Sequence, residues 1–307
     1  MKIILSGGSG QVGRLLSRAF VREGHECVIL TRGTGRSLET EPYPGETGRV
    51  RFVAWDGHTR GPWCAEVDGA DVVINLAGRS VDCRYTEANL RDMLRSRTES
   101  TRVIGEAIAN ANKPPQLWLQ ASTATIYAHR FDAANDEITG IIGGSEPGVP
   151  KHWKRSVEIG QAWEAALFEA PTPATRRVAM RSAMVMSPDA GGIFDAFATL
   201  CRFGMGHLGD GKAYVSWIHE HDFVAAVRFL MDESAVDGVV NLASPNPLPN
   251  KAFIGAVHAA LGRRWSVQAP AWLLEIGAFF RRTETELLLT QLPALFWREP
   301  QFSAVLP

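Results

Sequence analysis

Short apolar runs alternate along the chain with stretches in which apolar residues recur every three or four positions. The first run, 2–6, is followed by helical spacing over 14–23 and by a second run at 27–30. A short apolar run is typical of a buried strand, and the wider spacing is typical of a helix with one buried face. The opening of the chain therefore predicts a strand, a helix and a second strand.

The same alternation continues and predicts an α/β fold of the Rossmann type, with a doubly wound, mainly parallel sheet. The unbroken apolar run at 71–78 is typical of a parallel strand that is covered on both faces. Further strands are expected at 51–55, 117–121, 176–186, 214–218 and 239–243, and further helices at 86–112, 153–168, 193–203, 223–231, 250–262 and 271–281.

A glycine-rich turn joins the first strand to the first helix. This order of strand, glycine turn and helix is the one that a dinucleotide-binding βαβ unit requires. Gly7 and Gly10 allow the chain to turn tightly against a pyrophosphate, and Gly13 lets the helix pack closely. The N-terminus of the helix offers unpaired N–H groups to the phosphates. The residues expected to bind the nucleotide here are Gly7, Ser9, Gly10, Gln11, Val12 and Gly13.

The residue after the second strand indicates which nucleotide to expect. An acidic residue there would bond a ribose 2′-hydroxyl, whereas an arginine can accept a 2′-phosphate. The chain has Thr31-Arg32 at this point. We therefore expect NADP(H) rather than NAD(H), the alternative being that Arg32 is a surface residue without a ligand. Asp56, which leaves the third strand, is expected either beside the adenine or in an ordinary turn.

Residues that end the next two strands are suited to the same cleft, because ligands of such sheets bind outside the carboxyl ends of the strands. Leu76, Ala77 and Gly78 end the run at 71–78 and are expected to line the cofactor cleft. Ser122 and Thr123 end the following strand, and their hydroxyls are expected to face the nicotinamide.

The change of pattern after the glycines at 191–192 divides the chain. We expect residues 1–187 to form the NADP(H)-binding Rossmann domain and residues 188–307 to form a smaller C-terminal lobe that binds the substrate. The segment 223–243 is expected to return to the large domain. A homodimer formed through surface helices is compatible with this pattern, which does not itself predict one.

The composition limits the classes of partner. With a net charge of −1 over 307 residues, the chain has no general electrostatic attraction for nucleic acid or an anionic membrane. No run reaches 18 apolar residues, and the N-terminus has no cleavable signal pattern, so we expect a cytoplasmic protein that does not span a bilayer. The four cysteines have neither CxxC spacing nor paired histidines nearby, so we expect no metal site.

Several motifs together resemble the extended short-chain dehydrogenase/reductases, and more narrowly their atypical, epimerase-like subgroup in the NAD-dependent epimerase/dehydratase superfamily. The resemblance covers roughly residues 1–262. Besides the glycine turn, it rests on Thr31-Arg32, Asn75-Leu-Ala-Gly78, Cys83-Arg-Tyr-Thr86, Ser96-Arg97 with Thr101, Ser122-Thr-Ala-Thr-Ile-Tyr127, Trp163-Glu164, Arg181-Ser-Ala-Met-Val185 and Trp217-Ile-His219 with Asp222. The resemblance implies NADP(H) contacts at Thr31, Arg32, Leu76, Ala77, Asp92, Arg97 and Val185.

The chain departs from this family in the active site. Ordinary members carry a Tyr-x-x-x-Lys pair, in which the phenol is the acid or base and the ammonium lowers its pKa. Counted back from Glu164, these two positions fall on Ser156 and Gly160, which cannot perform these roles. Thr123 matches the family's active-site Ser/Thr, and Arg97 stands where ordinary members carry an asparagine.

Several residues are candidates to replace the missing pair. Tyr127 is the first of them, with a place in the pocket wall as its alternative role. The further candidates, each of which is otherwise a solvated loop or helix residue, are His129, Lys151, His152 and Lys154. We expect His219 and Asp222 to cap a helix rather than to form a catalytic dyad. Arg84 and Tyr85 are expected either to reach the substrate or to pack at the start of a helix.

Three functions are compatible with these residues. The first is an NADP(H)-dependent oxidoreductase or epimerase-like enzyme that acts on a small-molecule substrate, with Thr123 and Tyr127 as catalytic residues. The second is a non-catalytic NADP(H)-binding sensor or structural partner, which the absent Tyr-x-x-x-Lys pair favours. The third is a dehydratase or cyclase that performs no net redox chemistry on the same fold.

Overall fold

The computed structural model describes residues 1–33, 48–130, 132–207 and 210–263. The predicted helix at 271–281 therefore lies outside the described residues. The elements are β1 Lys2–Ser6, α1 Gln11–Arg22, β2 Glu26–Thr31, β3 Arg49–Ala54, α2 Cys64–Val67, β4 Val72–Asn75, α3 Glu87–Ala109, β5 Leu117–Thr123, a 3-10 turn Ala124–Ile126, α4 Lys151–Phe168, β6 Arg176–Ser182, β7 Met184–Met186, α5 Ile193–Arg202, β8 Tyr214–Val215, β9 Trp217–His219, α6 Glu220–Asp232, β10 Gly238–Leu242, β11 Leu248–Pro249 and α7 Asn250–Ala260.

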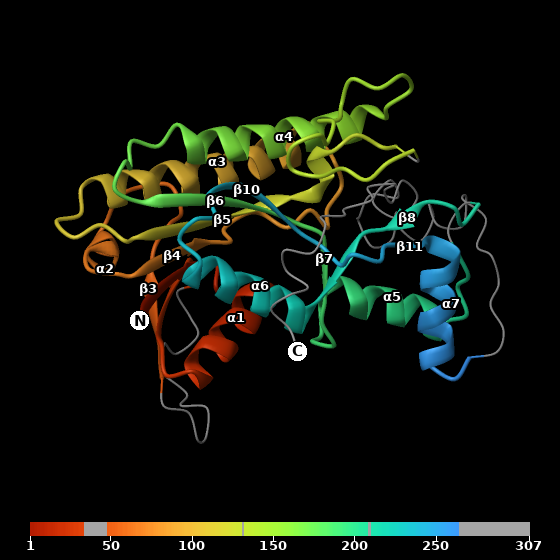
Figure 1. Cartoon of the computed structure of the whole chain (residues 1–307), viewed down its shortest axis with the longest axis horizontal. Helices are drawn as coiled ribbons and strands as arrows, with labels where there is room; N and C mark the ends of the chain where they lie inside the picture. Colours follow the sequence, from red (N-terminus) through yellow and green to blue (C-terminus); the bar gives the residue numbers. More distant parts are fainter. Residues whose placement is uncertain (34–47, 131, 208–209, 264–307) are drawn as a thin grey trace.

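The main sheet has seven strands in the order β10-β6-β5-β4-β1-β2-β3, and every neighbouring pair is parallel. Helices α3 and α4 cover one face of the sheet, and α1 and α6 cover the other (Figure 1). Successive side chains of β1 show why both faces are covered, because Ile3 and Leu5 join the core on one face while Ile4 joins the core on the other. The predicted Rossmann-type α/β fold is confirmed.

Two of the predicted strands are wrong in the same way, because each is two strands. The run 176–186 breaks at Ala183, whose N–H donates to the carbonyl of Leu242 at the end of β10. Beyond that point β7 leaves the main sheet and pairs with β9. The run 214–218 breaks at Ser216 into β8, which pairs with β11, and β9. An apolar run shows that a segment is buried but not which partner covers it.

The segment after β7 lies beyond the carboxyl ends of the main strands (Figure 1). There α5 and α7 pack together around a core that includes Phe197, Val215 and Phe253. The chain then returns, since α6 packs against α1 and β10 forms an edge of the main sheet beside β6. Among the helices of the described ranges, none combines the length and apolar character that crossing a bilayer requires.

Several helices begin earlier than the apolar spacing predicts. Helix α1 begins at Gln11 instead of Arg14, and α4 begins at Lys151, directly after Pro150. In both cases the first turn lies at the edge of the core, so its residues carry little of the apolar periodicity. Polar or glycine-rich first turns therefore escape a prediction that depends on buried side chains.

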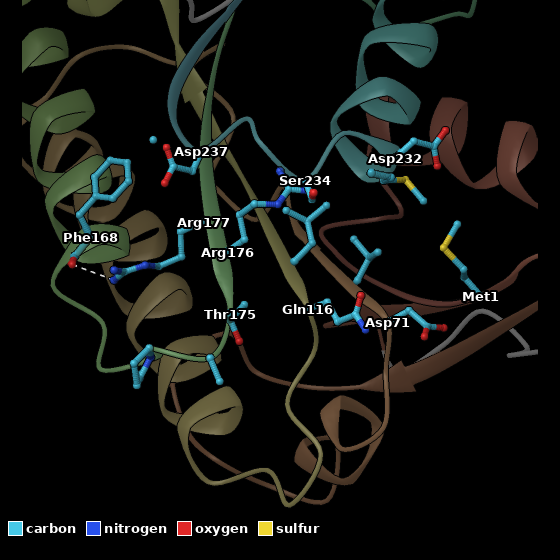
Figure 2. Close-up of a pocket in the computed structure, with 16 residues that line it drawn as sticks. Met1, Asp71, Gln116, Phe168, Thr175, Arg176, Arg177, Asp232, Ser234 and Asp237 are labelled. Atoms are coloured by element: carbon cyan, nitrogen blue, oxygen red, sulfur yellow. Dashed lines mark hydrogen bonds between the residues drawn. The ribbon is translucent and has the colours of Figure 1, made fainter.

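Two consecutive arginines at the start of β6 tie helices on both faces to the sheet. Arg176 donates to the carbonyls of Leu230 and Val236, at and just after the end of α6. Arg177 donates to the carbonyls of Phe168 and Ala170 at the end of α4, and Figure 2 shows its bond to Phe168. The last carbonyls of a helix lack partners within the helix, so a guanidinium satisfies them and interacts well with the helix dipole.

We expect Arg177→Ala to lower the free energy of unfolding by about 1–3 kcal/mol, because the bonds from a charged donor to the end of α4 are lost. Urea unfolding followed by circular dichroism measures the change. Arg95→Ala is the control, since Arg95 is exposed on α3 and pairs only within its own helix; it should change stability by about 0.5 kcal/mol or less. Equal losses in both variants would contradict the assignment.

Candidate active site

The glycine turn after β1 lies against the end of β4. Gly7 has φ +71, and a Cβ there would lie 2.8 Å from the carbonyl carbon and oxygen of Leu76 and 2.9 Å from the nitrogen of Ala77. Contacts this short exclude any side chain at Gly7, and the positive φ also favours glycine. The structure thus brings together two groups that the sequence predicted separately: the turn and the carboxyl end of β4.

The first turn of α1 is open toward this cleft. Its N-cap, Gly10, provides no side-chain hydrogen bond, and the first turn holds no acidic residue. A Cβ at Gly13 would lie 2.4 Å from the Cα of Gly8, so the close packing that Gly13 permits is against the glycine turn itself. Ser9 is exposed, and Val12 packs against the core. The amide nitrogen of Gln11 is buried, 2.3 Å from where a Cβ on Gly192 would lie.

The carboxyl end of β2 lies on the same side of the molecule as the glycine turn, where the parallel strands end. Leu30 pairs with Ser6 of β1, and Thr31 and Arg32 follow directly. The hydroxyl of Thr31 accepts from the N–H of Gly33 at 3.3 Å. Arg32 is exposed and has no carboxylate partner within the described ranges. Its guanidinium is therefore available to an anion at this edge.

Asp56 lies in a turn after β3. Its Oδ1 accepts from the N–H groups of His58 and Thr59, at 2.9 Å and 2.8 Å. Although partial burial acts in the opposite direction, these bonds lower the pKa of Asp56 to about 2. A carboxylate that is engaged in this way favours the turn interpretation over the expected contact with adenine.

A buried polar network supports the cleft from below. Asn75 Oδ1 accepts from the hydroxyl of Ser6 at 2.6 Å and from the N–H of Ala77 at 3.0 Å. Asn75 Nδ2 donates to Gln120 Oε1 at 2.9 Å, and the side chains of Ser6, Asn75 and Gln120 are fully buried. The network joins the carboxyl ends of β1 and β4 to the middle of β5, and it fixes the backbone that leads to Gly78.

Arg97, on α3, lies against the other side of Gly78. A Cβ on Gly78 would lie 3.2 Å from the guanidinium carbon of Arg97. The guanidinium lies over Trp163, with this carbon 5.0 Å from the centre of the ring. The guanidinium donates to the carbonyl of Met93 at 3.0 Å, and no carboxylate pairs with it among the residues described. Desolvation lowers its pKa from the ordinary value. A half-buried cation of this kind is suited to an oxygen-rich or anionic ligand.

Asp92 stands in a different setting from the one that the resemblance implies. Its carboxylate pairs with Arg79, the residue that follows Gly78, and the side chain is 55% exposed. Arg79 also donates to Asn89 Oδ1 at 2.8 Å. Asp92 therefore lies at the cleft edge but is neutralised by a neighbour that the sequence reasoning did not identify.

The two hydroxyls at the end of β5 differ from each other. Ser122 is buried and donates to Glu164 Oε1 at 2.5 Å, which favours a structural role for its hydroxyl over the expected contact with the nicotinamide. Successive residues of a strand point to opposite faces, which places Ser122 and Thr123 in different surroundings. Thr123 is half-buried, and its Oγ1 accepts from the N–H of Thr125 at 3.1 Å.

The positions of the missing pair lie beside Thr123 on α4. A Cβ on Gly160 would lie 3.3 Å from the methyl group of Thr123, so α4 packs closely there. The hydroxyl of Ser156, one turn earlier, donates to the carbonyl of His152 at 3.2 Å. Neither position carries a group that transfers protons near neutral pH.

Tyr127 is fully buried in a charged network. Its hydroxyl donates to Asn241 Oδ1 at 2.9 Å and accepts from Arg181 at 2.8 Å. Arg181 also donates to both carboxylate oxygens of Glu164, at 2.8 Å and 2.7 Å. Burial raises the pKa of Tyr127. This geometry favours the pocket-wall role over proton donation, and the one sequence signal for it was an arginine inside an apolar strand, which requires a buried partner.

The other candidates are dispersed. Lys151 and Lys154 are exposed on α4. The ring of His129 meets that of Trp153 edge-on with ring centres 4.3 Å apart, and burial lowers the pKa of His129. His152 meets the ring of Tyr85 edge-on at 6.0 Å.

Two further expected site residues lie after β6. His219 is the N-cap of α6, where its Nδ1 accepts from the N–H of His221 and Asp222 stands in the first turn, as the cap interpretation predicts. Val185 lies in β7 with its side chain in the core.

A groove of about 860 Å³ lies at the opposite end of the main strands, and Figure 2 shows residues that line it. It is lined by residues at or near the amino ends of the strands, among them Asp71, Gln116, Arg176 and Asp237. Because the glycine turn, Gly78 and Thr123 lie at the carboxyl ends, this groove is separate from the candidate active site.

Comparison with known proteins gives consistent results. Residues 3–141 match the NAD dependent epimerase/dehydratase family. The chain is 27% identical to the human epimerase family protein SDR39U1 over 293 residues, which cover 94% of this chain and 89% of the relative. It is 28% identical to the epimerase family protein YfhF of Bacillus subtilis over 273 residues, or 89% of this chain and 82% of the relative.

Solved structures are similar over most of the chain. The crystal structure of human SDR39U1 (isoform 2) with NADPH superposes with a TM-score of 0.76 at 28% identity, covering 94% of this chain and 89% of that one. MoeE5 in complex with UDP-glucuronic acid and NAD has a TM-score of 0.68 at 17% identity, covering 88% and 85%, which shows the shared fold alone. The chain thus has an NAD(P)-binding, epimerase-like fold, and its N-terminal part matches the family that its motifs predicted.

Proposed function

We propose that this protein binds NADP(H) in the cleft between the glycine turn and Gly78, and that it is an oxidoreductase or epimerase-like enzyme acting on a small carbonyl compound or the corresponding alcohol. The observation that carries the proposal is a cleft with open backbone N–H groups flanked by two arginines, Arg32 and Arg97, that lack carboxylate partners among the described residues. This is an arrangement for an extended anion with two separated polar ends.

The pyrophosphate is expected at the start of α1. The first N–H groups of a helix have no partners within the helix, and the dipole favours negative charge at that end. Gly10 leaves these donors uncapped, and Gly7 removes the side chain that would fill the space against Leu76. The residues expected to contact the phosphates are Gly7, Ser9, Gly10, Gln11, Val12 and Gly13.

The 2′-phosphate is expected at Arg32. A guanidinium can bind a phosphate with two parallel hydrogen bonds, and exposure at the end of β2 leaves Arg32 free to do so. The hydroxyl of Thr31 lies beside it. The human relative, similar along most of the chain, was solved with NADPH, which supports the same choice here.

At the far end of the cleft, Arg97 and Thr123 are expected to flank the nicotinamide riboside and the substrate. When bound, the nucleotide supplies or accepts a hydride at its nicotinamide ring. The N–H of Thr125 occupies a lone pair of Thr123 Oγ1, which leaves the hydroxyl proton of Thr123 for a substrate oxygen. Arg97 supplies positive charge where ordinary members carry a lysine on α4.

One observation favours a second function, that of a non-catalytic NADP(H)-binding protein. Ser156 and Gly160 hold the positions of the usual acid and its lysine, and Tyr127 is enclosed in the core. Turnover decides between the two: purified protein is mixed with NADPH and carbonyl probes, namely phenanthrenequinone, nitrobenzaldehyde and isatin. Oxidation of NADPH that depends on the probe supports the enzyme, whereas tight NADPH binding without turnover of any probe supports the binding protein.

We expect Arg32→Glu to raise the Kd for NADPH by about tenfold to a hundredfold, because a charge-assisted phosphate contact is replaced by repulsion. The Kd for NADH should change by less than about threefold on the same energy scale. Nucleotide titration followed by fluorescence measures both. Arg91→Glu, an exposed change of equal charge on α3, is the control and should leave both values unchanged. Equal losses for NADPH and NADH at Arg32 would contradict the assignment.

We expect Thr123→Ala to lower kcat with the probes by about tenfold to a hundredfold, since a hydrogen bond to the reacting oxygen is lost in the transition state. Thr123→Ser keeps the hydroxyl and should restore most of the rate. The Kd for NADPH should be the same in all three proteins. A rate that falls equally in the alanine and serine variants would show that the methyl group, which contacts the Gly160 region, matters instead.

We expect Tyr127→Phe to act on stability. The variant removes the hydroxyl that pairs with Arg181 and Asn241, which should lower the free energy of unfolding by about 1–3 kcal/mol. The turnover of the folded protein should stay within about threefold of the wild type, a change of less than one kcal/mol in the barrier. Urea unfolding and probe kinetics measure the two effects. A large fall in kcat with stability unchanged would restore Tyr127 as the proton donor.

A further inference from the structure

Two positions along α4 are those at which ordinary members of the family carry the proton donor and its cationic partner. These are the levels of Ser156 and Gly160, which lie four residues and about one helical turn apart. The Ser156 hydroxyl is bound to its own helix, and Gly160 has no side chain. A replacement that acts on the same substrate atom has to reach these levels from an element that packs on α4, either α3 with the segment before it or the 3-10 turn and β5. On the side of the 3-10 turn, the phenol of Tyr127 is already bonded to Arg181 and Asn241, which leaves the side of α3.

Tyr85 stands at the first of these levels. It lies two residues before the start of α3, is 8% exposed, and forms a cluster with Leu90 and Met93. Its ring meets His152 edge-on at 6.0 Å, and Ile159 packs against the same cluster. His152 comes about one turn before Ser156 on α4, and Ile159 comes about one turn after it. The Tyr85 side chain therefore lies beside α4 at the height of Ser156.

Arg97 stands at the second level. Its guanidinium stacks on Trp163, which comes about one turn after Gly160, and it also lies against Gly78 at the cofactor edge. It donates to the carbonyl of Met93, a member of the Tyr85 cluster. Desolvation lowers the pKa of Arg97, and the charge of an ionised Tyr85 acts in the opposite direction. A phenol and a cation thus occur together, in the same order along α4 as in the missing pair.

We propose that Tyr85 is the proton donor of this protein and that Arg97 is its cationic partner, so that a pair from α3 and the segment before it replaces the pair that α4 lacks. This inference rests on the proposed function, because it names the acid of the same site. It assigns the phenol of Tyr85 to the substrate oxygen, beside the hydroxyl of Thr123.

The proton balance of a reduction is simple. The carbonyl carbon of the substrate gains the hydride supplied by NADPH, and the electron pair of the C=O π bond moves to the oxygen. That oxygen takes the proton from Tyr85 Oη, which forms the alcohol O–H bond and leaves a phenolate. The guanidinium of Arg97 stabilises the phenolate, because an opposite charge nearby favours the ionised form. Water then returns a proton to Tyr85.

The first test needs neither substrate nor nucleotide. The chain has four tyrosines, so the rise of phenolate absorbance near 295 nm with pH resolves into few steps. We expect one step at least about one pH unit below the ordinary tyrosine value of about 10. Tyr85→Phe should remove this step, and Arg97→Met should move it upward. Tyr214→Phe, which alters a tyrosine on β8, should leave it in place. A wild type without this early step, or one that keeps it in Tyr85→Phe, would overturn the proposal.

The second test uses NADPH and phenanthrenequinone. Tyr85→Phe keeps the packing of the ring and should lower kcat by about a hundredfold or more, the usual contribution of a general acid. The Kd for NADPH should match that of the wild type, circular dichroism should show that the variant is folded, and Tyr214→Phe should react at the wild-type rate. Normal turnover by Tyr85→Phe would overturn Tyr85 as the donor while leaving the proposed function intact. Failure of the wild type to bind NADPH would overturn the proposed function, and the absorbance titration would still decide whether Tyr85 and Arg97 form the pair.

Discussion

The close seating of the glycine turn on the end of β4 is the constraint on which the rest of the site depends. Gly7 approaches the Leu76–Ala77 backbone to a distance that no Cβ allows, and Asn75 binds Ser6 and Ala77 from below. Because these bonds join adjacent strands at their carboxyl ends, the start of α1, the end of β2 and the edge at Gly78 keep fixed positions relative to one another. A pocket for a nucleotide follows from this backbone geometry before any side chain is considered.

The arginines near this cleft differ in whether the protein itself supplies their partners. Arg181 lies in a buried strand and has a complete set of partners, with Glu164 on two bonds and Tyr127 on a third. Breaking such a pair leaves a buried charge without compensation, so it fixes the position of α4 over the sheet. Arg32 and Arg97 have no carboxylate partner in the described parts of the chain. Cations that are left uncompensated at the edge of a cleft are the ones suited to bind a ligand.

The sequence predicts local features well and distant pairings poorly. Periodicity identified β1, α1 and β2, and the spacing of glycines placed the turn between them. It could not show that the run 176–186 divides at Ala183, since burial looks the same in either sheet. Nor could it orient Ser122, because the partner that turns this hydroxyl inward, Glu164, lies 42 residues away. The sequence did not predict the network around Arg181 for the same reason. A buried charge requires a partner, but the sequence does not show which residue that partner is.

The close packing around Gly160 bears on two points: the absence of the usual Tyr-x-x-x-Lys pair and the pair that we propose in its place. A side chain at this position would begin 3.3 Å from the methyl group of Thr123, so a lysine there would require the Thr123 side chain to shift by a few tenths of an ångström. On the side of α4 that faces α3, the ring of Tyr85 meets His152, one turn before Ser156, and the charge near Trp163 comes from Arg97. Among the described elements that pack on α4, α3 and the segment that leads into it bring a phenol and a cation to this height, whereas Tyr127, on the side of the 3-10 turn, is already bonded to Arg181 and Asn241.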